Sequence, residues 1–103
     1  MWGVQTTKSV IRSAGSRTRR MERLVKGFAN HRRIEILELL EKTSELSVGE
    51  ISMELEIELK TASEHIRRCT IAGLLMKRSD GREVRHKLTP RGKKVLTFLR
   101  MLE

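Results

Sequence analysis

Two short stretches with helical periodicity flank a tight hinge within residues 45–75, which read ELSVGEISMELEIELKTASEHIRRCTIAGLL. Ser47 and Glu50 have the spacing of a capping box, so the first helix should begin here. Three apolar residues supply its buried face: Val48, Ile51 and Leu55. The second helix is expected from about residue 59 to residue 72, and Gly73 should end it. Two short helices joined by a tight turn form the helix-turn-helix pattern, which constrains the fold of this chain most strongly.

The second helix of this motif is expected to have two chemically different faces. Apolar and small residues gather on one side at helical spacing: Ala62, Ile66, Cys69 and Gly73. Cys69 is therefore expected in the core, and His65 falls at the edge between the faces. The other side carries groups that can hydrogen-bond base edges and phosphates, concentrated toward its N-terminal half: Lys60, Thr61, Ser63, Glu64, Arg67 and Arg68.

Two further helices are expected before the motif. Apolar residues at positions i, i+3, i+4 and i+7 predict a helix from about Arg17: Met21, Leu24, Val25 and Phe28. Asn30 can cap a second helix, whose apolar face would be formed by Ile34, Ile36, Leu37, Leu39 and Leu40. Residues 1–16 are rich in Ser, Thr and Gly and are expected to form a flexible basic arm. Residues 17–103 then form one domain.

A basic β-hairpin and a last helix are expected after the motif. The Asp80-Gly81 pair is a turn signal between two segments that can pair, residues 74–79 and 83–88. The hairpin is unusually basic, with Lys77, Arg78, Arg82, Arg85, His86 and Lys87. Its apolar face must pack against the helices and consists of Leu75, Val84 and Leu88. Thr89 and Pro90 should cap and start the last helix, whose surplus of apolar residues suggests a partner surface.

The net charge of +9 favours a polyanionic partner, such as nucleic acid or an anionic membrane. The charge is also segregated along the chain. Residues 1–33 carry nine basic and one acidic side chain, residues 34–59 carry one and eight, and residues 60–103 carry twelve and four. Different surfaces are therefore expected to have different roles, although solvated acidic faces on the two middle helices would explain the acidic block equally well.

Composition argues against several classes of protein. A single cysteine cannot form an internal disulfide, and no stretch approaches the roughly 18 apolar residues of a membrane span. The N-terminus lacks the apolar run of a signal peptide, so a cytoplasmic protein without membrane contact is expected. With three aromatic residues and no Tyr, the stacking platforms used for single-stranded nucleic acid are scarcely available.

Three segments resemble the ArsR-type family of transcriptional regulators. FANHRRIEILELL (28–40) is similar to the family's LADPTRLRILRLL opening, and residues 45–75 are similar to its ELxVxELAxxLxLSxxTVSxHLxxLxxAGLV core. Six residues of that core correspond position by position: Ser63, His65, Ile66, Ala72, Gly73 and Leu74. LTPRGKKVL (88–96) also resembles the start of the last helix in related MarR-like and ArsR-like proteins.

The resemblance covers roughly residues 17–102. It implies a winged helix-turn-helix fold, mainly α with a β-hairpin wing, in the order α-α-α-α-β-β-α. It also implies a dimeric regulator of transcription that binds double-stranded DNA.

The chain departs from the metal-sensing members of this family. Where those members carry Cys-Val-Cys, this chain has Ser47-Val48-Gly49, and residues 89–102 contain no His or carboxylate to hold a metal. The other soft ligands are too scattered for a tetrahedral set: His31, His65, His86 and Cys69. No metal site and no cofactor are therefore expected. Glu58 stands where the family usually has Ser before the recognition helix; it can still cap that helix but adds negative charge near phosphate.

The leading hypothesis is a homodimeric repressor, without the metal site, that binds DNA sequence-specifically and associates through its first and last helices. The recognition helix would enter the major groove, and the wing would grip the backbone or the minor groove. The expected DNA-binding residues are Lys60, Thr61, Ser63, Glu64, Arg67 and Arg68 on the helix and Lys77, Arg82, Arg85 and Lys87 on the wing.

Three other interpretations differ in class. A winged-helix protein-interaction module in a larger complex is the main alternative, because the fold hosts such roles. A regulatory thiol at Cys69 is less favoured, because a buried cysteine without a low-pKa environment is usually inert. An enzyme is not expected, since the chain has no paired-carboxylate signal, no glycine-rich phosphate loop and no plausible Cys/His or Ser/His/Asp set.

Overall fold

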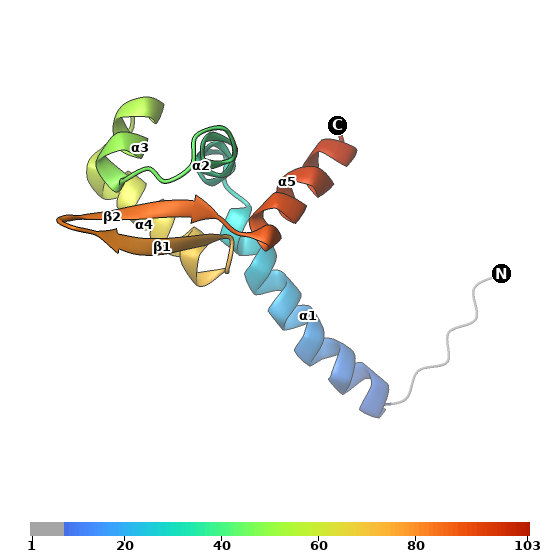
Figure 1. The fold of residues 1–103 in the computed structure, drawn as a ribbon. Coiled ribbons are helices and arrows are strands. Elements are labelled where there is room, and N and C mark those ends of the chain that lie inside the picture. Colours follow the sequence, from blue (N-terminus) through green and yellow to red (C-terminus); the bar gives the residue numbers. More distant parts are fainter. Residues whose placement is uncertain (1–7) are drawn as a thin grey trace.

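The computed structural model describes residues 8–103, with side chains described from residue 15 onward. Within this range the elements are α1 (Lys8–Phe28), α2 (His31–Lys42), α3 (Val48–Leu55), α4 (Leu59–Ile71), β1 (Leu75–Asp80), β2 (Glu83–Leu88) and α5 (Pro90–Met101). The order and the mainly helical content confirm the predicted winged helix-turn-helix (Figure 1).

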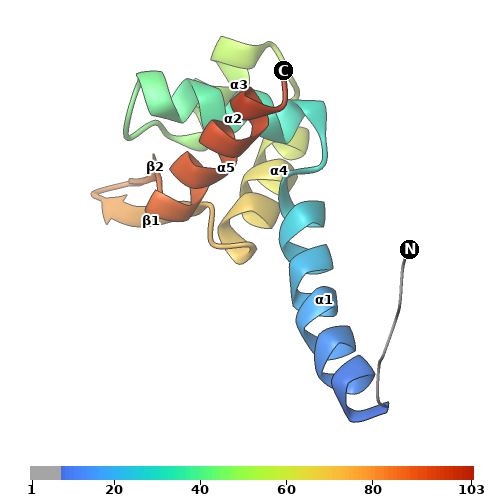
Figure 2. The same ribbon diagram turned by 90° about the vertical axis from the view of Figure 1, so that its right-hand side faces the viewer.

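The first helix begins earlier than expected. It starts at Lys8 instead of near Arg17, so residues 8–16, which were expected in a flexible arm, belong to α1. Gly15 is the only glycine in that stretch, and a helix tolerates a single glycine at a cost of about 1 kcal/mol relative to alanine. The rest of the expected arm, residues 1–7, lies outside the described residues. Figures 1 and 2 show the N-terminal part of α1 extending away from the other elements.

Three helices begin at the side-chain caps that the sequence predicts. Asn30 Oδ1 accepts two backbone N–H groups of the first turn of α2. Ser47 Oγ accepts the Glu50 N–H at 3.2 Å while the Glu50 carboxylate accepts the Ser47 N–H at 2.8 Å, which completes the capping box. Thr89 Oγ1 caps α5. The expected cap at Glu58 is wrong: this side chain makes no capping hydrogen bond, since Glu is too long to be a favoured N-cap residue.

One hydrophobic core joins the helices to the hairpin. Its centre is α2, whose Ile36, Leu37 and Leu40 are fully or almost fully buried. The predicted apolar face of α4, the last helix and the hairpin contribute further core residues: Ala62, Ile66, Cys69, Leu75, Leu88, Val95 and Leu96. The helix α5 packs against α2 and β2, and Figure 2 shows it crossing in front of α2.

The hairpin forms as predicted, with a shift of one residue in its turn. Asp80 pairs with Glu83, so the two-residue loop is Gly81-Arg82 and not Asp80-Gly81. Gly81 has a φ of 64°, a conformation that glycine adopts without strain. Leu75 and Leu88 pack into the core as expected. Val84 was also expected in the apolar face, but it is 41% exposed and does not pack there.

The second strand also contacts the segment before α3. The His86 N–H donates to the Leu46 carbonyl oxygen at 2.9 Å, and His86 Nδ1 lies 3.0 Å from the same oxygen. His86 is buried, so it belongs to the base of the wing and not to its basic surface. This bridge anchors the wing beside the helix-turn-helix.

Candidate nucleic-acid interface

The solvent-facing side of α4 consists of the polar residues that the sequence predicts. All six are exposed: Lys60, Thr61, Ser63, Glu64, Arg67 and Arg68. The opposite side of the helix is buried, and His65 between the two sides is partly exposed. The two-faced helix is therefore confirmed.

Glu64 joins Arg67 and Arg68 into one ion-pair cluster. Arg67 donates to both carboxylate oxygens at 3.0 and 3.2 Å, and Arg68 Nε donates to one of them at 3.0 Å. These hydrogen bonds, Arg67 first, lower the pKa of Glu64 to about 2, so the carboxylate stays ionised at neutral pH. Part of the positive charge on this face is therefore offset within the helix, at the i, i+3 and i, i+4 spacings that favour such pairs.

A shallow hollow lies between the first turns of α3 and α4. Lys60, Ser63 and Glu64 line it together with Val48 and Leu59. Leu59 is 58% exposed, so an apolar side chain stands beside a cation, a hydroxyl and a carboxylate. This combination can read base edges and thymine methyl groups in a major groove. No charge or helical pattern in the sequence singles out Leu59.

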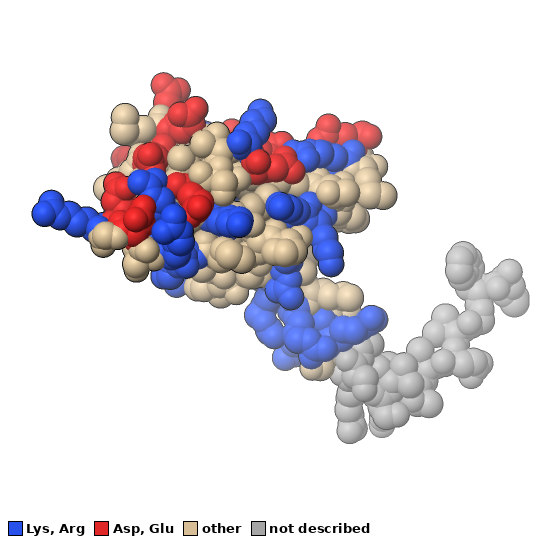
Figure 3. Space-filling view, in the orientation of Figure 1, with Lys and Arg blue, Asp and Glu red and all other residues tan. Residues whose placement is uncertain are grey.

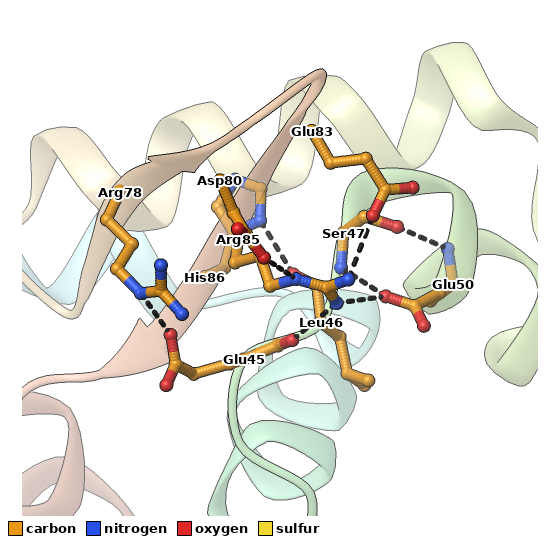
Figure 4. A network of polar contacts seen from close by, with 9 residues as sticks. All are labelled: Glu45, Leu46, Ser47, Glu50, Arg78, Asp80, Glu83, Arg85 and His86. Atoms are coloured by element: carbon orange, nitrogen blue, oxygen red, sulfur yellow. Dashed lines mark hydrogen bonds and ion pairs between the residues drawn. The ribbon is translucent and has the colours of Figure 1, made fainter.

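Arg85 occupies a different environment from the one expected for a phosphate contact. Its guanidinium donates to the carboxylates of Asp80, Glu83 and Glu50 at 2.9 to 3.0 Å and to the Glu45 carbonyl oxygen at 3.0 Å (Figure 4). Its side chain is 26% exposed. The hydrogen bond to Asp80 is the main reason why the pKa of Arg85 is raised. Arg85 thus connects the wing to the start of α3.

The three other wing candidates are exposed and make no ion pair within the described residues: Lys77, Arg82 and Lys87. Arg82 lies in the loop at the tip. Lys77 lies opposite His86 in the antiparallel pairing, so these two side chains share one face of the hairpin. Lys87 follows His86 along β2, and its side chain therefore points to the other face. The tip of the wing and the first turns of α4 lie on the same side of the molecule, away from α1 (Figure 1).

The charge segregation seen along the sequence is visible on the surface. Figure 3 shows basic side chains over the described part of α1 and acidic side chains over α2, α3 and the part of the wing near its tip. The basic residues of the wing therefore stand beside acidic ones instead of forming a uniform patch.

Ser47, at the position of the first family cysteine, is engaged in the capping box. Among the described residues no three His, Cys, Asp or Glu side chains come together as a metal site.

Among the helices that the structure describes, every one is too short or too polar to cross a membrane.

Cys69 is a packing residue. Its Sγ lies 3.9 Å from the Gly27 carbonyl oxygen at the contact between α4 and α1. Burial raises the pKa of the thiol to about 11, so the sulfur is protonated at neutral pH. The predicted burial is confirmed.

Residues 30–77 match the model of the bacterial regulatory protein, arsR family. None of the curated proteins compared with the chain matches it. The solved structure of reduced HlyU from Vibrio cholerae is 30% identical in sequence, with a TM-score of 0.73. That similarity covers 88% of this chain and 96% of HlyU.

Two further solved structures are similar. A fragment of Mb0332 from Mycobacterium bovis is a homodimeric winged helix-turn-helix DNA-binding domain and a possible ArsR-family transcriptional regulator. It is 25% identical, with a TM-score of 0.70 over 99% of this chain and 88% of that one. NolR from Sinorhizobium fredii shares the fold at 18% identity, with a TM-score of 0.80 over 99% and 96%. The chain thus belongs to the arsR family of bacterial regulatory proteins.

Proposed function

We propose that the protein is a cytoplasmic transcriptional repressor that binds double-stranded DNA sequence-specifically as a homodimer, without a metal ion as its inducer. The observation that carries this proposal is the exposed polar face of α4, a helix whose first turns lie on the same side of the molecule as the tip of a basic wing (Figure 1). The similar Mb0332 fragment, a homodimeric DNA-binding domain, supports it.

The first turns of α4 have the chemistry required in a major groove. Lys60, Thr61 and Ser63 are exposed there and present an ammonium group and two hydroxyls to base edges and phosphates. Arg67 and Arg68 follow one to two turns later, where they can contact the backbone. On the wing, the proposed phosphate contacts are made by Lys77, Arg82 and Lys87. Arg85 holds the wing in position.

The dimer interface is proposed on α1 and α5. These helices and the C-cap residue of α5 expose five large apolar side chains, which are between 47 and 77% accessible: Met21, Val25, Phe98, Met101 and Leu102. So much exposed apolar area on two helices is typical of a protein interface. A twofold dimer would present its two α4 helices to half-sites about one helical turn, ~34 Å, apart.

The interface can be tested separately from DNA binding. Phe98→Glu should convert the dimer to a monomer in analytical ultracentrifugation, because it places a charge in the apolar contact. Thr97→Glu introduces the same charge at the neighbouring exposed position and should leave the dimer intact. A dimer that persists in the Phe98 variant would place the interface elsewhere.

DNA binding is tested by replacing two arginines of α4. The Arg67→Ala/Arg68→Ala variant should lose affinity for genomic duplex fragments in fluorescence anisotropy. The slope of the logarithm of the association constant K against the logarithm of salt concentration should become shallower by up to about 1.8. Each phosphate that is no longer neutralised removes about 0.9 from this slope. Arg17→Ala/Arg19→Ala removes the same charge from exposed positions of α1 and serves as the control.

Two results would contradict the proposal. Equally weakened binding in the two double variants would mean that only net charge matters. A salt dependence near zero for the native chain would favour the alternative function, a winged-helix module that binds another protein.

A further inference from the structure

A basic pocket lies at the junction of α1 and the C-terminal end of α4, with one residue each from α2 and α5. Its volume is about 510 Å³, and none of its ten lining residues is acidic. Six of them are cationic: Arg20, Arg23, Lys26, Arg33, Arg68 and Arg91. A concave site lined by one sign of charge attracts and concentrates ions of the opposite sign.

Two of these guanidinium groups are held by neutral acceptors. Arg33 Nη1 donates to the Lys26 carbonyl oxygen at 2.7 Å, and its Nε donates to His65 Nδ1 at 3.2 Å. Arg91 Nη1 donates to the Ala72 carbonyl oxygen at 3.2 Å. Both arginines are therefore positioned without neutralisation of their charge, and each keeps N–H groups free for a bidentate contact with phosphate.

Two of the four remaining cations, Arg20 and Arg23, are also unneutralised within the described residues. Arg23 makes no hydrogen bond or ion pair with the described residues, and Arg20 bonds only a serine hydroxyl. Lys26 and Arg68 each pair with an exposed carboxylate outside the lining. Four of the six cations therefore lack a carboxylate partner among the residues that the structure describes.

The pocket also has an apolar part. Leu24, Ile71 and Ala72 line it between the cations. The helices α1 and α4 approach each other closely here: a Cβ added at Gly27 would lie only 2.4 Å from the Ala72 Cβ. An anion with an apolar or aromatic body fits this combination of charge and apolar surface better than a bare ion.

This pocket uses a side of α1 that differs from the proposed dimer face. With about 100° of rotation per residue, Arg20, Leu24 and Gly27 lie together on the helix. Met21 and Val25 are displaced from them by roughly a third of a turn. A partner subunit on the apolar face would therefore leave the pocket open.

We propose that this pocket binds a small phosphorylated ligand. The guanidinium groups of Arg23, Arg33 and Arg91 hold its phosphate, and Leu24 and Ile71 contact its apolar body. On α4 the pocket is lined from Arg68 onward, about 8 Å along the helix axis from Ser63, the last of the residues proposed to enter the groove. The site is therefore distinct from the proposed base-reading surface.

Binding is tested by isothermal titration of the full chain with two probes, inorganic pyrophosphate and ADP, at low salt. Both should bind saturably with one site per chain, and ADP should bind more tightly because its nucleoside adds apolar contact. Arg23→Gln should weaken both by about tenfold, the effect typical of removing one charged hydrogen bond. Because Arg23 has no partner within the described residues, this variant should fold normally.

A matched pair of double variants separates the pocket from general charge. Arg23→Gln/Arg91→Gln should weaken binding further, whereas Arg19→Gln/Lys94→Gln, at exposed positions outside the pocket, should change it less than twofold. Equal weakening in the two double variants, or no saturable binding, would overturn the proposal.

A competition experiment separates a free ligand from a DNA phosphate. A duplex fragment added to the ADP complex should leave ADP bound. Displacement of ADP by the duplex, with weaker duplex binding by Arg23→Gln/Arg91→Gln, would overturn the small-ligand proposal and assign the pocket to the DNA backbone. Because the proposed groove contacts are not altered in these variants, DNA binding can fail or succeed independently of this site.

Discussion

Arg85 Nη1 lies 3.0 Å from Glu50 Oε1, the same carboxylate oxygen that accepts the Ser47 N–H in the capping box. The Glu50 carboxylate therefore both caps the start of α3 and forms an ion pair with Arg85 of the wing. The contact joins β2 to the helix-turn-helix across 35 residues of sequence. Together with the backbone bridge between His86 and Leu46, this contact holds the wing beside the helix-turn-helix.

Replacing Arg85 by Ala should release the wing without removing a phosphate contact. We expect faster hydrogen exchange in β1 and β2 and weaker duplex binding with an unchanged salt dependence. Arg82→Ala, at the exposed tip, should instead reduce the slope of log K against log salt by about 0.9. A comparable reduction in slope for Arg85→Ala would show that Arg85 contacts phosphate directly.

Replacing Glu64 by Gln should strengthen binding to nonspecific duplex DNA. The change removes the carboxylate that pairs with Arg67 and Arg68, so more positive charge on α4 becomes available to phosphates. The salt dependence should become steeper, as measured by fluorescence anisotropy at several salt concentrations. Glu22→Gln removes an exposed carboxylate of α1 that pairs with Lys26, and it should have a smaller effect. Weaker nonspecific binding by Glu64→Gln would contradict the prediction, because the carboxylate would then not reduce the contact of Arg67 and Arg68 with phosphates.

Replacing Ser47 by Ala should destabilise the protein by about 1 kcal/mol, the typical value of an N-cap side chain. The variant leaves a backbone N–H of the first turn of α3 without its acceptor. Urea unfolding measures the decrease in stability, and Ser44→Ala, at an exposed loop position outside the helices, provides the control. Equal stability of the two variants would mean that the cap is replaced by water without cost.

Stability should fall as the pH drops below about 6.5, the ordinary pKa of a histidine. Burial, reinforced by the neighbouring Arg33, lowers the pKa of His65 in the folded protein. Glu64 opposes this shift, and His31 and Arg32 add to it. Between the lowered and the ordinary pKa the unfolded chain binds more protons, so the free energy of unfolding decreases with decreasing pH until His65 is protonated in the folded state.

This pH dependence can be measured in two ways. An NMR titration should give a folded-state pKa for His65 below about 6.5, the ordinary histidine value. The decrease in unfolding free energy on acidification through that value should be smaller in His65→Gln, which cannot be protonated. A titration midpoint at or above the ordinary value would contradict this prediction.

Local signals predicted the helix-turn-helix well. Ser47 and Glu50 are three residues apart, so their reciprocal hydrogen bonds can be anticipated from spacing alone. Gly73 has a φ of 78° after α4, the left-handed conformation that glycine favours at a helix end. The burial of Cys69 and the exposure of Arg67 likewise follow from helical periodicity.

Interactions between distant segments were not predictable in the same way. The partners of Arg85 around the start of α3 lie 35 and 40 residues away in sequence, so no spacing rule relates them. The charge of Arg85 suggested a phosphate contact, whereas the tertiary fold surrounds it with carboxylates. The basic pocket arises for the same reason, because Arg23, Arg68 and Arg91 belong to three helices that only the folded chain brings together.

Selection of bound duplexes from a random pool by the full chain tests sequence-specific binding by a symmetric dimer most directly. We predict enrichment of a palindromic sequence whose half-sites are centred about one helical turn, ~34 Å, apart. A pool without enrichment, or a single asymmetric site, would contradict it.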